Sequence, residues 1–133
     1  MSGSDAVINL AIDSLVLASW GEVVTGILRG EPGRIEQQLD GDAVFYDAFF
    51  GTVTGAANIA RKLGRMKGRA FNSATGEVRT ALSDETSCAV EWIQRLTTPE
   101  GPMTLEVASF CSVRDGRITR LCDYVQPLEN RKP

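Results

Sequence analysis

The chain has 133 residues, of which 43% are hydrophobic and 23% are charged, and its formal net charge is −3. This is the composition of one ordinary globular domain. The chain has no histidine, which excludes Ser–His–Asp and Cys–His nucleophiles, a histidine acid or base, and zinc sites that use imidazole. The negative charge argues against a broad nucleic-acid surface, and no stretch of about 18 apolar residues is present to cross a membrane.

The first third of the chain is expected to be helical. Apolar residues recur at spacings of three to five over residues 4–29, which predicts a long amphipathic helix. Ser4 is its expected N-cap, and Gly21 marks a position where the helix is expected to break. A second, short helix is predicted over residues 34–39, followed by a turn at residues 40–42.

The remaining two thirds are expected to consist of strands and one helix. Residues 43–50 are rich in aromatic and β-branched side chains and predict a strand, and residues 56–66 predict a third helix. Four further strands are predicted near 73–82, 87–96, 103–114 and 117–126. Short turns join these four strands, so they must pair antiparallel. The element order predicts a single α+β domain spanning residues 1–133, with helices on one face of a curved antiparallel sheet and a pocket between them.

The cysteines and the N-terminal segment indicate the cellular compartment in which the protein is expected. Cys88, Cys111 and Cys122 lie in strand-like sequence and form no C-x-x-C pair, so we expect small buried thiols in a reducing compartment. The N-terminal segment has no basic region, and Asp13 interrupts its apolar run, so no signal peptide is expected. These features favour a cytoplasmic protein with no nucleic-acid or membrane partner.

Several stretches resemble the nuclear transport factor 2-like superfamily, which includes ketosteroid isomerase, limonene-epoxide hydrolase and the SnoaL-like polyketide cyclases. The similar segments are Trp20…Gly30-Glu31, residues 39–47 (LDGDAVFYD), 55–59 (GAANI), 90–92 (VEW) and 113–124 (VRDGRITRLCDY). The resemblance covers roughly residues 18–127 and implies a cone-shaped sheet wrapped around the helices, with an apolar interior. It also implies a homodimer formed through the outer face of the sheet, and no cofactor is expected.

Asp47 is the first candidate catalytic residue. It lies in the aromatic stretch of residues 45–50, where burial would raise the pKa of a carboxyl group toward that of a useful base. Its position matches the general base of ketosteroid isomerase. The alternative is a strand-end aspartate that accepts backbone N–H bonds from the turn at Gly51. The tyrosine and second aspartate of the isomerase align with Val23 and Ser109, so steroid isomerase activity is not expected.

Asp123 and Glu91 are the other two candidate catalytic residues. Asp123 matches a catalytic aspartate of limonene-epoxide hydrolase, and the partner aspartate of that enzyme aligns with Glu91. The arginine that positions the pair aligns with Ala89. The alternatives are that Asp123 is a surface carboxylate paired with Arg120 or Arg114, and that Glu91 points outward from the sheet.

The expected ligand is an apolar small molecule. Side-chain alternation places Phe45 and Phe49 on the same face as Asp47. The residues expected to line a substrate pocket are Tyr46, Trp20, Trp92, Phe49, Ser109 and Tyr124. The alternative for the two tryptophans and two tyrosines is a place in the core, which is the commoner role of single aromatic residues at helical or strand spacing. We therefore expect carboxylate acid–base chemistry in a hydrophobic pocket: isomerisation, polyketide-type cyclisation or epoxide opening. The alternative is a non-catalytic binding or dimerisation module of the same fold.

Overall fold

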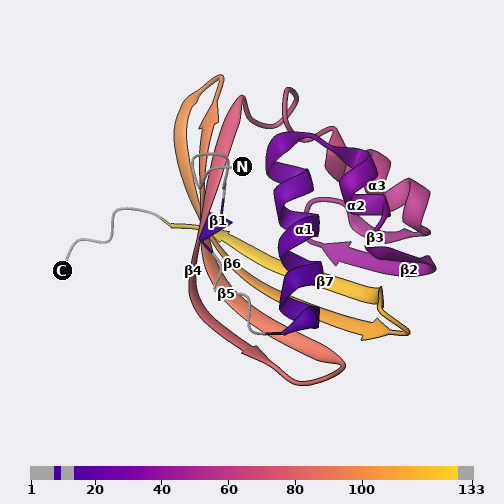
Figure 1. The fold of residues 1–133 in the computed structure, drawn as a ribbon. Helices are drawn as coiled ribbons and strands as arrows, with labels where there is room; N and C mark the ends of the chain where they lie inside the picture. The colour runs from indigo at the N-terminus through magenta and orange to yellow at the C-terminus, as the bar shows by residue number, and fades with distance from the viewer. Residues whose placement is uncertain (1–7, 10–13, 129–133) are drawn as a thin grey trace, which may run out of the picture.

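The computed structural model describes residues 8–9 and 14–128, which form a curved sheet with the helices on one side of it (Figure 1). The sheet has seven strands in the order β1-β4-β5-β6-β7-β2-β3. In chain order the elements are β1 (Ile8–Asn9), α1 (Leu15–Arg29), α2 (Pro32–Glu36), β2 (Leu39–Asp47), β3 (Gly51–Thr54), α3 (Ala56–Gly64), β4 (Ser73–Ser83), β5 (Ser87–Thr98), β6 (Gly101–Arg114) and β7 (Arg117–Pro127). The predicted α+β class is confirmed.

The first helix begins later than predicted. Ser14 is the N-cap of α1, and its hydroxyl accepts the Leu17 N–H at 3.0 Å. Upstream, Ile8–Asn9 is a short strand that pairs parallel with β4, so the prediction of one helix over residues 4–29 is wrong, and Ser4 lies outside the described residues. The predicted break at Gly21 is also wrong, because α1 is continuous through it.

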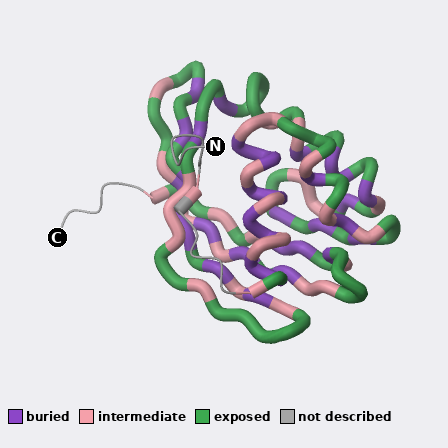
Figure 2. The backbone as a smooth tube through the Cα atoms, in the orientation of Figure 1, coloured by how far each residue is buried: buried purple, intermediate pink, exposed green. Residues whose placement is uncertain are grey.

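Two glycines explain how the helices pack closely. A Cβ atom added to Gly26 would lie 2.6 Å from Cγ1 of Ile35, so α2 can cross α1 only where the side chain is absent. Gly64 plays the same role between α3 and α2, since its Cβ would lie 2.7 Å from Cβ of Pro32. Nine of the 15 residues of α1 are buried, and Figure 2 shows buried stretches both on α1 and on the strands of the sheet. This packing holds α1 and α3 above the concave face.

The strand predicted over residues 43–50 corresponds to the second half of β2 and the turn that follows it. β2 starts at Leu39, passing through the predicted turn at 40–42, and ends at Asp47. Residues 48–50 then turn, and β3 returns antiparallel to β2. The turn forms because an oxygen of Asp47 accepts the backbone N–H groups of Phe49 and Phe50. We did not predict β3.

The four-stranded meander is as predicted, because β4 to β7 pair antiparallel in sequence order. The sheet as a whole is mixed, since β2 lies parallel to β7, with Phe45 beside Leu121 and Tyr46 beside Cys122. Continuing this register by one residue places Asp47 beside Asp123 on the concave face. The topology thus brings together two residues that are far apart in the chain.

The core lies between α1 and the sheet. Trp20 and Trp92 pack edge to face there, with ring centroids 5.6 Å apart. Gly76 on β4 leaves room for Trp92, since a Cβ at that position would lie 3.1 Å from the indole ring. The three cysteines are free and buried, as predicted. Within the described residues, no helix combines the length and apolar character needed to span a membrane.

Candidate active site

A cavity of about 350 Å³ opens between the concave face of the sheet and helices α1 and α3. Its walls are mainly apolar, with contributions from Ile27 of α1, Leu63 of α3, Phe45 of β2 and Leu105 of β6. Its polar side chains are Asp47, Gln94, Thr98, Glu100 and Asp123. The cavity therefore combines an apolar body with a few polar groups, which is the usual character of a small-molecule site.

Asp47 lines this cavity at the end of β2 and is only 5% exposed. Its Oδ1 accepts the N–H of Phe49 at 2.9 Å and that of Phe50 at 2.7 Å. Burial raises the pKa of Asp47 above its ordinary value, and the two backbone hydrogen bonds partly oppose this rise. Oδ2 has no hydrogen-bond partner among the described residues. One oxygen of Asp47 therefore closes the turn, as the second interpretation of the sequence expected, and the side chain also lines the cavity.

Asp123 lies on the adjacent strand β7 and ends a hydrogen-bond chain that begins at the buried indole of Trp92. The Trp92 indole N–H donates to the Ser109 hydroxyl oxygen at 2.9 Å, and that hydroxyl donates to Oδ1 of Asp123 at 2.7 Å. Burial raises the pKa of Asp123 to about 7; the Ser109 hydrogen bond lowers it, and the negative charge of Asp47 raises it further. No ion pair joins Asp123 to Arg120 or to any other described residue. It is a cavity carboxyl group and not a paired surface aspartate.

The two aspartates form a carboxyl pair with no cation beside it. Among the described residues that line the cavity, none is lysine or arginine, and the third acidic side chain is Glu100 in the β5–β6 turn. Without a neighbouring positive charge, two carboxylates so close together resist ionising at the same time. Near neutral pH the pair can therefore offer one proton donor and one proton acceptor.

Of the other predicted site residues, Trp92 and Phe49 line the cavity. Ser109 does not line it but donates a hydrogen bond to Asp123, which does. Phe49 lies at its edge but is 71% exposed, because β2 ends before it and the side chain no longer follows the alternation of the strand. Trp20 is wholly buried in the core and does not line the cavity.

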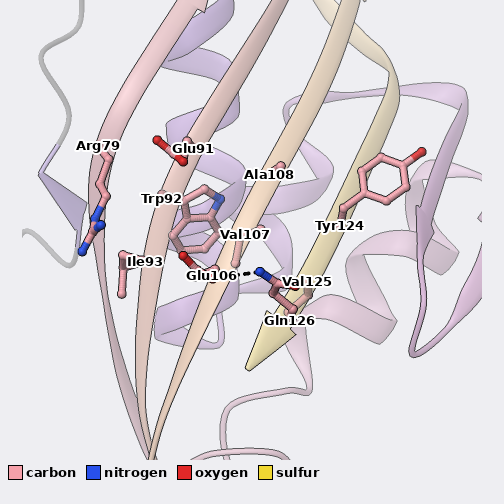
Figure 3. Close-up of a pocket in the computed structure, with 10 residues that line it drawn as sticks. All are labelled: Arg79, Glu91, Trp92, Ile93, Glu106, Val107, Ala108, Tyr124, Val125 and Gln126. Atoms are coloured by element: carbon pink, nitrogen blue, oxygen red, sulfur yellow. Dashed lines mark hydrogen bonds between the residues drawn. The ribbon is translucent and has the colours of Figure 1, made fainter. Parts of the chain in front are cut away.

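Tyr46, Tyr124 and Glu91 lie on the opposite, outer face of the sheet. The ring of Tyr124 is 6.3 Å from Tyr46 and 6.0 Å from Phe110, and all three side chains are exposed. Glu91 is exposed and accepts a hydrogen bond from the Thr80 hydroxyl. Figure 3 shows Glu91 and Tyr124 along a shallow groove of this face. The structure therefore separates these three residues from Asp47 and Asp123, because strand neighbours of an inward residue point outward.

Gln94 is a site residue that we did not predict. It lines the cavity from β5 and is 7% exposed, two positions after Trp92 and two before Leu96. The signal that could have identified it is this period of two, which places a polar amide among inward-facing apolar side chains.

The fold and the paired carboxyl groups define the class of protein. It is an α+β cone of the nuclear transport factor 2-like type, with an acidic pair in an apolar cavity. The family model of the SnoaL-like domain matches residues 21–121, so the chain belongs to the SnoaL-like domain family. No curated protein sequence matches the chain at a significant level.

Solved structures show the same fold at low identity. The chain is similar to an epoxide hydrolase of the limonene-epoxide hydrolase-like type from M. tuberculosis, with a TM-score of 0.69, 22% identity, and coverage of 84% of this chain and 83% of that chain. A candidate polyketide cyclase from Xanthomonas campestris gives a TM-score of 0.64 at 22% identity, covering 83% and 89%. A candidate ketosteroid isomerase from Kribbella flavida gives 0.67 at 20% identity, covering 90% and 83%. At these identities the similarity shows the fold alone.

Proposed function

We propose that the protein is an enzyme that uses Asp47 and Asp123 for acid–base chemistry on an apolar, carbonyl-containing small molecule. The observation that carries this proposal is the carboxyl pair itself, inside an apolar cavity with no cation along its described walls. An enolisation, followed by isomerisation or by an aldol-type cyclisation, is the reaction class that such a pair serves best.

In the proposed reaction Asp47 is the base. Its Oδ2 takes a proton from the carbon next to the substrate carbonyl, and the C–H electron pair becomes the C=C bond of an enol. The backbone N–H groups at its Oδ1 favour the ionised form that this step requires. The proton then returns to another carbon in an isomerisation, or the enol carbon attacks a second carbonyl in a cyclisation.

Asp123 is the acid of the same step. Its pKa of about 7 keeps a large share of the side chain protonated at neutral pH, so it can donate to the carbonyl oxygen as negative charge develops there. The Ser109 hydroxyl holds Oδ1, which leaves Oδ2 to carry the proton. Epoxide opening is less well supported, because no guanidinium group lines the described cavity to position the two carboxylates.

The test is exchange of the methyl protons of 4-acetylbiphenyl in D₂O, followed by proton NMR. We expect catalysis by the wild-type protein and a loss of about 10²- to 10⁴-fold in Asp47→Asn and in Asp123→Asn. Asp42→Asn, which changes an exposed aspartate of β2, is the matched control and keeps the wild-type rate. Unchanged exchange in both site variants would contradict the proposal. Hydrolysis of styrene oxide without exchange would assign the pair to epoxide opening instead.

We further propose that the protein forms a homodimer through the outer face of the sheet. The support is the exposed aromatic cluster of Tyr46, Phe110 and Tyr124 on that face, since exposed aromatic groups of this kind are typical of interfaces. Sedimentation should give twice the mass of the chain, and Phe110→Glu should give a folded monomer. A wild-type monomer at micromolar concentration would contradict this proposal.

A further inference from the structure

Gln94 is a polar residue in the mainly apolar wall of the cavity. Its side chain is 7% exposed and lines the cavity, and no hydrogen bond to its amide exists among the described residues. Thr98 is the other buried, uncharged polar residue of the cavity wall, and it has protein partners. Its hydroxyl donates to the Gly101 carbonyl at 2.8 Å and accepts the Glu100 N–H at 3.2 Å. Among the described residues, the side-chain nitrogen or oxygen that is both fully buried and unpaired is Nε1 of Trp20, so the amide atoms of Gln94 reach the cavity space. A ligand can bind them there, and a ligand that covers the amide without replacing its hydrogen bonds to water loses free energy.

The strand register places Gln94 away from the carboxyl pair. Asp123 lies opposite Ser109, Ser109 lies opposite Val90, and Gln94 is four residues beyond Val90 on β5. Four residues of strand span about 13 Å, and two strand spacings add about 10 Å across the sheet. Between the two positions the wall is formed by the apolar side chains of Val107 and Trp92. One ligand must therefore be elongated to reach both polar sites.

We infer that Gln94 binds an oxygen at the far end of the substrate, so that the substrate is an elongated apolar molecule with two separate oxygen functions. One function, the reacting carbonyl, lies at Asp47 and Asp123, and the other accepts a hydrogen bond from the Gln94 amide. This inference rests on the proposed function, and it adds a specificity-determining residue and a substrate shape.

The charge of the cavity further restricts the second function. Asp47, Asp123 and Glu100 all line the cavity, and no described lining residue is basic, so a carboxylate or phosphate at the far end would be repelled. A carboxamide side chain is neutral and both donates and accepts. The group that it binds is therefore a neutral carbonyl or hydroxyl.

The test uses two probes of equal shape. 4,4′-Diacetylbiphenyl carries a carbonyl at each end, whereas 4-acetyl-4′-isopropylbiphenyl replaces one carbonyl oxygen by a methyl group. Wild-type protein should bind the diketone about tenfold more tightly in calorimetry, because the isopropyl compound leaves the Gln94 amide buried and unpaired. In Gln94→Met, which is of similar shape but cannot donate, this preference should disappear. Gln37→Leu, an exposed glutamine at the end of α2, is the control and should keep it.

Gln94→Met also gives a result that needs no ligand. Removing an unpaired amide from an apolar wall should leave the melting temperature unchanged or raise it. A fall of more than about 5 °C would show that the amide supports the fold, and would overturn the inference.

The binding outcomes separate the two proposals. Equal affinity of wild-type protein for both probes, or a preference that persists in Gln94→Met, would overturn the role of Gln94 alone. Failure of both probes to bind would count against the apolar site itself, and so against the proposed function and this inference together.

Discussion

Replacing Asp123 by asparagine should make the protein more stable at alkaline pH. Burial raises the pKa of Asp123 from 3.8 to about 7 in the folded protein. Between these values the folded state binds more protons than the unfolded state, so stability falls as pH rises from about 4 to 7 and is level above that. A difference of roughly three pKa units corresponds to about 4 kcal/mol, because one unit is worth about 1.4 kcal/mol.

Asparagine cannot ionise, so Asp123→Asn does not lose folding stability as the pH rises. It keeps an oxygen that can accept the Ser109 hydroxyl, so the hydrogen-bond chain to Trp92 is preserved. Since Asp123 is partly exposed in the cavity, water reduces the effect, and we expect Asp123→Asn to exceed the wild type by about 2–4 kcal/mol at pH 8. At pH 4 the two proteins should be nearly equal.

Urea unfolding at a series of pH values measures this difference directly. Asp42→Asn, at an exposed site, controls for the general effect of removing one negative charge. Parallel stability curves for the wild type and Asp123→Asn between pH 4 and 8 would contradict this prediction, because they would mean that Asp123 ionises equally easily in the folded and unfolded states.

Three further predictions concern the site and the fold. Ser109→Ala should cost about 1–3 kcal/mol in urea unfolding, because it leaves the buried Trp92 N–H unpaired; a neutral effect would contradict this. Gly64→Ala should lower the free energy of unfolding by about 1–3 kcal/mol, because its Cβ would meet the first residue of α2. Gly33→Ala, with open space around it, is the control and should be neutral or stabilising. Equal effects of the two substitutions would contradict this prediction. Proton exchange of 4-acetylbiphenyl should decline above about pH 7 as Asp123 loses its proton, and a rate that keeps rising with pH would exclude it as the acid.

Much of the fold was predictable because its strands and turns have strong local signals. The four strands from β4 to β7 alternate regularly and are separated by turn residues, so their antiparallel order follows from chain connectivity. The errors arose where a tertiary contact overrides a local pattern. Ile8–Asn9 has helical spacing with later residues, yet it pairs with the edge of β4. Residues 48–50 were also predicted as strand because of their aromatic side chains, but they form a turn that depends on the side chain of Asp47.

The candidate site was predictable in part, and the rule that would have improved it is alternation. If Asp47 and Asp123 face the cavity, their neighbours Tyr46 and Tyr124 must face outward, as the structure shows. The same rule places Glu91 outward once Trp92 is inward. The position of Asp47 beside Asp123 was not predictable, because it depends on the parallel pairing of β2 with β7, and no sequence signal fixes the partner of an isolated strand.

Carbon-13 NMR titration of the Asp123 carboxyl group shows whether Asp47 and Asp123 act as a paired acid and base. We expect a midpoint at about pH 7 in the wild-type protein and a lower midpoint in Asp47→Asn, because that variant removes the negative charge that raises the pKa of Asp123. A midpoint near the ordinary value of 3.8, or no change in Asp47→Asn, would contradict a paired acid and base in this cavity.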